Sequence, residues 1–169
     1  MGYIHVYTGD GKGKTTAAFG LAIRALMSGK KVYIGQFVKD MAYNETKIAN
    51  DYENLTIEQL GKGCFIKRKP TDEDKKIGKA ALDKCYELYK KDIYDLIILD
   101  ELCIALYFGL ISTQEVMDCF FNEKYQAEIV ITGRYCPEEL IERADLVTEM
   151  KEIKHYYNQG VNSRDGFDR

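Results

Sequence analysis

The chain has 169 residues, of which 46% are hydrophobic, and it carries a formal net charge of −3 at pH 7. A chain of this length is expected to form a single domain, residues 1–169, with a sizeable core. Its mild acidity excludes a globally basic surface, so we expect no nucleic acid partner.

The sequence shows neither a long apolar stretch nor a signal peptide, and the first expected strand already starts at Tyr3. We therefore expect a cytoplasmic protein with no membrane partner. Five cysteines occur without Cys-x-x-Cys spacing, and only His5 and His155 could join them at a metal, so a zinc or iron–sulfur site is not expected. We interpret these cysteines as reduced thiols. They are Cys64, Cys85, Cys103, Cys119 and Cys136.

The most informative stretch is a glycine-rich turn, YTGDGKGKTT, which we call the glycine loop (residues 7–16). The run before it, Tyr3–Tyr7, is rich in aromatic and β-branched residues, as expected for a buried strand. Small and apolar residues then recur at helical spacing from Lys14 to about Met27. Strand, loop and helix thus follow one another in the order that a phosphate-binding loop requires.

This loop offers several groups that bind phosphate. Its three glycines permit positive φ angles that turn N–H groups inward, and the helix start adds unpaired N–H groups and a positive dipole end. Lys14 can reach phosphate oxygens, and the Thr15 hydroxyl stands where a phosphate-bound Mg²⁺ usually takes a protein ligand. Thr8 departs from the pattern G-x-x-x-x-G-K-[ST], because it occupies the first glycine position. The candidate binding residues are Gly9, Asp10, Gly11, Lys12, Gly13, Lys14, Thr15 and Thr16.

The rest of the chain alternates strands and helices. Ser28-Gly29 ends the first helix, and Thr71 is expected to cap a helix that runs to about Lys91. Continuous apolar strands separated by helices predict a three-layer α/β fold with a mostly parallel sheet of about six strands, in which ligands bind beyond the carboxyl ends of the strands. Further strands are expected at 31–37, around 55–57, and at 96–99, 128–132 and 146–150, and further helices at 113–121 and 137–143.

Two further candidate positions follow strands at that edge. Asp100 and Glu101 come after the strand at 96–99, where a P-loop protein holds the acid that orients Mg²⁺. Because side chains alternate along a strand, the two carboxylates are expected to point in different directions, and the sequence leaves open which one faces the metal. Arg134 follows the strand at 128–132 and could clamp phosphate oxygens, although a plain surface arginine fits the local pattern equally well.

Six segments spread over nearly the whole chain form a recognisable set. They are TGDGKGKTTAAFG (8–20), GQFVK (35–39), LDEL (99–102), ITGR (131–134), ADLVTEM (144–150) and KH (154–155). In this order they resemble the ATP:corrinoid adenosyltransferases, a P-loop family. The resemblance implies a RecA-like P-loop NTPase fold, usually a homodimer. It also implies transfer of the 5′-deoxyadenosyl group of ATP to the Co(I) of a corrinoid, with release of triphosphate.

The same resemblance implies particular ligands and residue roles. ATP and a corrinoid, cobalamin or cobinamide, are the expected substrates, and an electron donor must reduce the cobalt. Mg²⁺ or Mn²⁺ is expected on Thr15 with Asp100 or Glu101, and Lys14 and Glu101 are the expected catalytic residues. The family uses aromatic side chains in the loop that corresponds to residues 61–67 to displace the lower axial ligand of the cobalt. Phe65 is therefore the candidate wedge in this chain.

The chemistry of this reaction needs no activating dyad, because Co(I) is already a strong nucleophile that carries no proton. The protein has to position C5′ and to neutralise the growing charge on the triphosphate. Two other classes of protein use the same loop: a nucleoside-kinase-like phosphotransferase and a RecA-like ATPase. The mild acidity and the short chain weigh against the ATPase, whereas only the family resemblance weighs against the phosphotransferase.

Overall fold

The computed structural model describes residues 1–38, 43–61 and 69–168. Within these residues six strands form one sheet in the order β3-β2-β4-β5-β1-β6, and every neighbouring pair is parallel. This arrangement confirms the expected α/β fold with a parallel central sheet. The strands are β1 (Ile4–Thr8), β2 (Val32–Gln36), β3 (Leu55–Gln59), β4 (Leu96–Asp100), β5 (Glu128–Thr132) and β6 (Leu146–Glu149).

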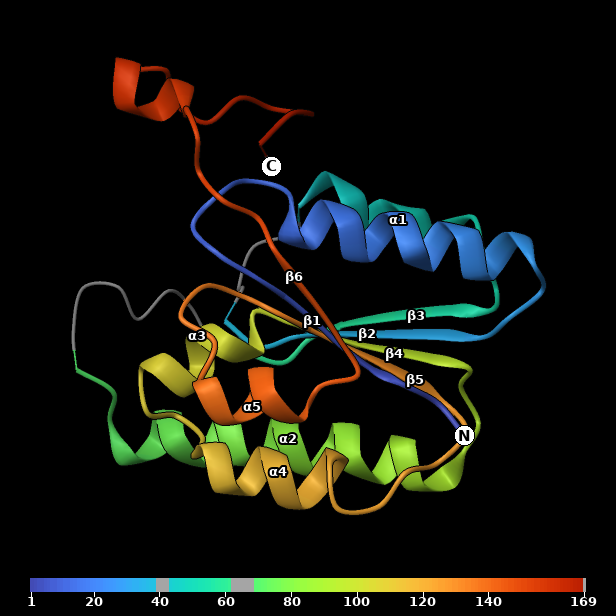
Figure 1. Cartoon of the computed structure of the whole chain (residues 1–169). Helices are drawn as coiled ribbons and strands as arrows, with labels where there is room; N and C mark the ends of the chain where they lie inside the picture. The colour runs from blue at the N-terminus through green and yellow to red at the C-terminus, as the bar shows by residue number, and fades with distance from the viewer. Residues whose placement is uncertain (39–42, 62–68, 169) are drawn as a thin grey trace.

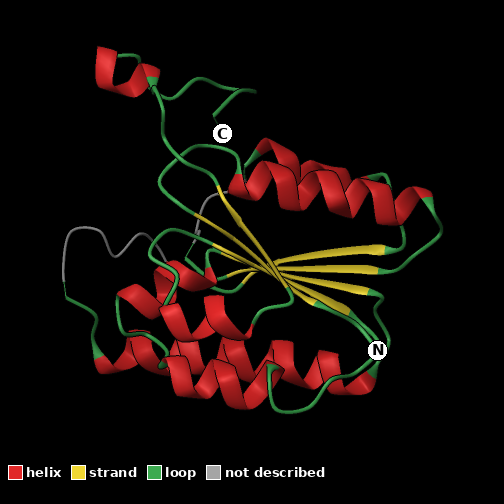
Figure 2. Ribbon diagram, in the orientation of Figure 1, coloured by secondary structure: helices red, strands yellow, loops and turns green. Residues whose placement is uncertain are grey.

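Helices cover both faces of the sheet and so form the two outer layers (Figures 1 and 2). One face carries α1 (Lys14–Met27) and the 3-10 helix η1 (Asn44–Asn50). The other face carries α2 (Asp72–Lys91), α3 (Leu102–Tyr107), α4 (Thr113–Phe120) and α5 (Glu138–Arg143). A short 3-10 helix, η3 (Tyr156–Gln159), follows β6 in the chain. No helix of the described ranges combines the length and the apolar character that a bilayer span requires.

The core consists of two apolar clusters separated by the sheet. Alternation along a strand explains this division, because neighbouring residues such as Ile97 and Ile98 face opposite layers. Ile98 packs in the cluster of α1 with Ala22 and Leu26, whereas Ile97 packs in the cluster of α2 to α5. All five residues of β4 are buried. Burial of the sheet on both faces is therefore the reason for the continuous apolar strands.

Most helix ends follow the expected local signals. Thr71 caps α2 in a capping box, in which Asp74 N donates to Thr71 Oγ1 (3.3 Å) and Thr71 N donates to Asp74 Oδ2 (2.8 Å). The helix α3 and the 3-10 helices η1 and η3 were not expected. The sequence of α3, LCIALY, simply continues the apolar run of β4, so no periodic pattern sets it apart.

The strand order brings the carboxyl ends of four strands together. In the register of the sheet, Gln36 is the Cα partner of Asp100, and Tyr7 is the partner of Thr132. The last residues of β1, β2, β4 and β5 are all polar and buried. They are Thr8, Gln36, Asp100 and Thr132, respectively. The glycine loop leaves the sheet at this edge, directly after Thr8.

Candidate functional site

The glycine loop connects β1 to α1 and depends on glycine for two reasons. Gly9 and Gly13 have φ angles of 99° and 125°, a region that other residues rarely adopt. At Gly9 and Gly11 the chain after β6 also approaches closely, because an added Cβ would lie 2.6 Å from the Met150 carbonyl oxygen. The Gly11 N–H donates to that oxygen at 2.6 Å, so this donor is used within the protein.

Lys14 curls back over the loop and is only 7% exposed. Its Nζ donates to the carbonyl oxygens of Gly9 (2.6 Å) and Gly11 (2.7 Å). Burial lowers the pKa of Lys14, and the positive charge of Arg134 lowers it further. An ammonium group has three N–H donors. Two of them make these contacts in the described structure, so the third can bind an incoming phosphate oxygen.

Asp100 lies at the centre of a buried polar network. Its Oδ1 accepts hydrogen bonds from Thr15 Oγ1 and Thr132 Oγ1, both at 2.8 Å. Its Oδ2 accepts a hydrogen bond from Gln36 Nε2 at 3.0 Å. Asp100, Gln36 and Thr132 are 0% exposed, so the carboxylate is held by protein donors on both oxygens. The network joins the first turn of α1 to the ends of β2, β4 and β5.

The same network contains oxygen atoms that could bind a cation. Hydroxyl and carboxylate oxygens are the ligands that Mg²⁺ prefers, and Thr15 and Asp100 present one of each at contact distance. In the described part of the chain, Gln36 Oε1 is buried and has no hydrogen-bond partner. A buried acceptor without a donor is costly, and a metal-bound water would satisfy it. The residues present therefore fit the expected Mg²⁺.

Glu101 lies beside the network in a different way from the expected one. β4 ends at Asp100, and Glu101 adopts a left-handed conformation with φ of 61° at the start of α3. The expected alternation of side chains along a strand therefore does not apply to Glu101, because this residue lies outside β4. Its N–H donates to Thr132 Oγ1 at 3.0 Å, which fixes the turn. The negative charge of Glu101 raises the pKa of Lys14, so the two side chains lie within electrostatic reach.

Arg134 lies within electrostatic reach of the glycine loop, and the residue after it belongs to a pair of stacked aromatic rings. Arg134 is exposed, and its positive charge lowers the pKa of Lys14. Tyr135, which follows it, has a positive φ of 59° and stacks on Tyr107 with ring centroids 4.3 Å apart. The two rings remain 53% and 60% exposed. The stack therefore offers an exposed aromatic surface.

The remaining predicted residues occupy different positions. Asp10 and Thr16 are exposed, and the charge of Asp10 raises the pKa of Lys14. The Lys12 side chain extends away from the loop, and its Nζ donates to Tyr156 Oη at 2.7 Å. Phe65 lies outside the described residues.

Sequence reasoning missed Gln36, Thr132, Tyr107 and Tyr135 as members of the site. For Gln36 and Thr132 a signal was present, because each is a polar residue at the end of an apolar strand. The two tyrosines are separated by α4 and β5, and no local pattern links them.

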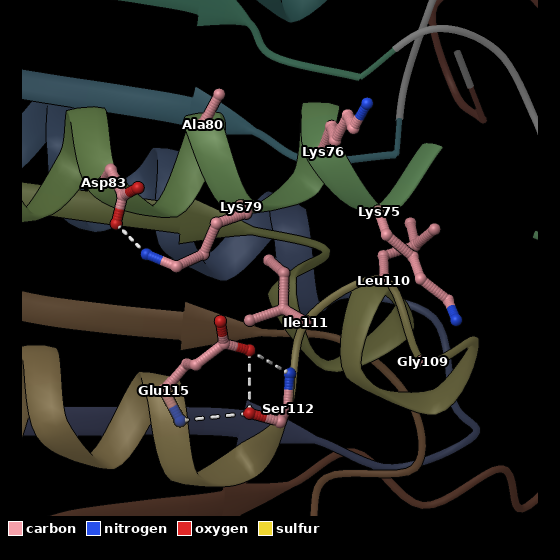
Figure 3. Close-up of a pocket in the computed structure, with 10 residues that line it drawn as sticks. All are labelled: Lys75, Lys76, Lys79, Ala80, Asp83, Gly109, Leu110, Ile111, Ser112 and Glu115. Carbon is pink, nitrogen blue, oxygen red and sulfur yellow. Dashed lines mark hydrogen bonds and ion pairs between the residues drawn. The ribbon is translucent and has the colours of Figure 1, made fainter. Parts of the chain in front are cut away.

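A separate hollow of about 610 Å³ lies between α2 and the turn that precedes α4 (Figure 3). None of the predicted site residues lines it. Four of its polar side chains form two pairs, Lys79 with Asp83 and Ser112 with Glu115. Leu110 and Ile111 form its apolar wall.

Comparison with known proteins agrees over almost the full chain. A model of the family "ATP:corrinoid adenosyltransferase BtuR/CobO/CobP" matches residues 1–168. The corrinoid adenosyltransferase of Escherichia coli (strain K12) is 31% identical over 167 residues, which cover 99% of this chain and 85% of that protein. A corrinoid adenosyltransferase from Sinorhizobium sp is 36% identical over 169 residues, covering 98% and 79%. The chain therefore belongs to the ATP:corrinoid adenosyltransferase family.

Proposed function

We propose that this protein transfers the 5′-deoxyadenosyl group of ATP to the Co(I) of a corrinoid, such as cobalamin or cobinamide, in adenosylcobalamin biosynthesis or salvage. The reaction releases triphosphate. The observation that carries the proposal is the 2.8 Å hydrogen bond between Thr15 and Asp100, which joins the glycine loop to a buried acid at the end of β4. That pairing is typical of a nucleotide and Mg²⁺ site, and membership of the family indicates the acceptor.

On the nucleotide side, the protein has to stabilise the charge that grows on the triphosphate as the bond to C5′ breaks. Lys14 would exchange its contacts with the Gly9 and Gly11 carbonyls for phosphate oxygens. Mg²⁺ (or Mn²⁺), when bound, would neutralise part of that charge. Thr15 and Asp100 would hold the ion, and Glu101 would face it from the start of α3. Arg134 would also contact the phosphates.

On the acceptor side, the protein has to hold a large planar ring with the cobalt in line with C5′. The stacked rings of Tyr107 and Tyr135 support this role, because both are exposed and Tyr135 directly follows Arg134 in the chain. A separate electron donor would reduce the cobalt of the corrinoid to Co(I). We further propose, from family resemblance, that the enzyme is a cytoplasmic homodimer and that Phe65 displaces the lower axial ligand of the cobalt.

Product analysis tests the transfer directly. With ATP, Mg²⁺ and chemically reduced cobalamin, the expected products are triphosphate and adenosylcobalamin, which differ from ADP by anion-exchange chromatography and by the cobalamin spectrum. Release of ADP would instead indicate a phosphotransferase or an ATPase. Lys14→Ala and Thr15→Ala should each lower turnover by about 100-fold or more while leaving circular dichroism unchanged. Lys75→Ala, at an exposed lysine on α2, is the control.

A second experiment tests Phe65. Four-coordinate Co(II) is easier to reduce, so a wedge that removes the lower ligand should matter only when reduction occurs on the protein. Phe65→Ala should slow adenosylation that starts from Co(II) under reducing conditions, and it should have much less effect when Co(I) is supplied. Equal rates from Co(II) for the variant and the wild type would show that Phe65 only packs in its loop.

A further inference from the structure

The side chain of Lys12 is held by the last residues of the described chain. Its Nζ donates to Tyr156 Oη at 2.7 Å, to the Phe167 carbonyl oxygen at 2.5 Å and to the Asp168 carboxylate. A lysine ammonium has three donors and no acceptor. These three contacts therefore use its full donor capacity, and none of its donors remains for a phosphate.

Asp168 is the centre of this arrangement, and only 12% of its side chain is exposed. Its carboxylate also accepts hydrogen bonds from Tyr156 Oη, and from N and Nε of Arg164 (3.0 and 3.2 Å). The Arg164 guanidinium lies over the rings of Tyr156 and Phe167, 4.6 and 5.2 Å from their centroids. These donors, Lys12 first, hold the pKa of Asp168 well below its usual range. Residues 155–168, which we call the C-terminal strap, thus fold around one carboxylate that pairs with the glycine loop.

The chain that leads into the strap is also packed along the glycine loop. Met150 N donates to the Thr8 carbonyl oxygen at 2.8 Å, and Gly11 N donates to the Met150 carbonyl oxygen at 2.6 Å. Farther along, Asn44 Nδ2 on η1 donates to Asp165 Oδ1 at 2.8 Å. Figure 1 shows the strap on the same side of the sheet as the start of α1. The outer side of the loop is therefore lined by residues 149–168.

Apolar burial does not account for this position of the strap. Tyr157 and Phe167 remain 69% and 72% exposed, and nearly all other strap residues are exposed as well. Surface that stays in water contributes little hydrophobic stabilisation. The polar contacts with Lys12 and Asn44 are therefore what tie the strap to the rest of the protein.

We infer that Lys12 is a positioning residue that anchors the C-terminal strap, and that the anchored strap forms the outer wall of the nucleotide site. This inference rests on the proposed function of the glycine loop. In this role the side chain of Lys12, one of the candidate binding residues of the glycine loop, would not bind phosphate, while its peptide N–H is unaffected. Fixing the loop before ATP arrives lowers the ordering cost of binding, so the anchor should act on nucleotide affinity.

A double-mutant cycle with Lys12→Met, Asp168→Asn and both together tests the anchor. Each single change should raise the KM for ATP about three- to fivefold, which corresponds to the upper end of the free energy that an exposed ion pair contributes. The double variant should match Lys12→Met, because that change alone already releases the contact with Asp168 together with those to Tyr156 and Phe167. The kcat and the corrinoid KM should stay within about twofold of the wild type, a split that general loss of structure would not produce.

The pair Lys79 and Asp83 on α2 supplies a matched control (Figure 3). Its lysine side chain is 45% exposed, against 41% for Lys12, but neither residue lies near the glycine loop. Lys79→Met and Asp83→Asn should leave the KM for ATP unchanged. Circular dichroism and thermal melting of every variant check that the fold is retained.

Each other outcome overturns the anchor. A lower KM for ATP in Asp168→Asn would mean that the strap competes with the nucleotide, and an unchanged KM would mean that the strap plays no part. A fall of more than about twofold in the kcat of Lys12→Met, with the kcat of Asp168→Asn unchanged, would show that Lys12 contacts phosphate directly. Failure of the proposed function is distinguishable, because it would alter the product made by the wild type and not the pattern of KM values.

Discussion

Replacing Asp100 by alanine and by asparagine should separate the structural from the metal-binding role of this buried carboxylate. Alanine removes the acceptor of three side-chain donors, Thr15 Oγ1, Thr132 Oγ1 and Gln36 Nε2. A buried donor left without an acceptor costs about 1–3 kcal/mol, and removal of the buried charge offsets part of this loss. We therefore expect the free energy of unfolding to fall by about 3–5 kcal/mol in Asp100→Ala.

Asparagine should be tolerated far better, because Gln36 can compensate. The new side chain keeps one acceptor oxygen for the two threonine hydroxyls and presents an NH₂ group toward Gln36. If the Gln36 amide turns over, its Oε1, which lacks a partner among the described residues, would accept from that group. The expected loss for Asp100→Asn is below about 1.5 kcal/mol. Turnover should nevertheless fall and need more Mg²⁺, because the proposed Mg²⁺ site would lose the negative charge of Asp100.

Urea unfolding followed by far-ultraviolet circular dichroism measures the two stabilities, and turnover at increasing Mg²⁺ measures the metal requirement. Combining Asp100→Asn with Gln36→Met should abolish the advantage of asparagine, since methionine cannot accept the new hydrogen bond well. The reasoning is refuted if Asp100→Ala unfolds within about 1 kcal/mol of the wild type, or if asparagine costs as much as alanine.

Three further expectations follow from the site. Glu101→Gln should weaken Mg²⁺-dependent turnover more than metal-free nucleotide binding measured by calorimetry, and equal losses would make the acid structural. Because burial lowers the pKa of Lys14 below its ordinary 10.5, the KM for ATP should rise as the pH approaches that value from below. Over the same pH range the ligand-free protein should become more stable against unfolding, because Lys14 keeps its proton in the unfolded chain after it has lost it in the folded chain. A KM for ATP that does not change up to pH 10.5 would contradict this assignment. The Cys103 thiol lowers the pKa of Cys136, while burial raises the pKa of Cys85 to about 12. Iodoacetamide should therefore modify Cys136 before Cys85, and peptide mass spectrometry would show the order.

Local signals in the sequence determined the strands, the longer helices and the glycine loop of this protein. Continuous apolar runs predicted the strands, Thr71 predicted the start of α2, and Ser28-Gly29 predicted the end of α1. These features depend on steric and hydrogen-bonding preferences that act within a few residues, so a single sequence carries them. The position of an acid at the end of β4 was predictable for the same reason.

Only the tertiary structure decided how these parts meet. The strand order places β4 between β2 and β5, and this order gives Asp100 its contacts with Gln36 and Thr132, 64 and 32 residues away in the chain. The left-handed turn at Glu101 depends on its hydrogen bond with Thr132. Lys12 meets Asp168 across 156 residues. Such contacts follow from packing of the whole chain, and no local pattern encodes them.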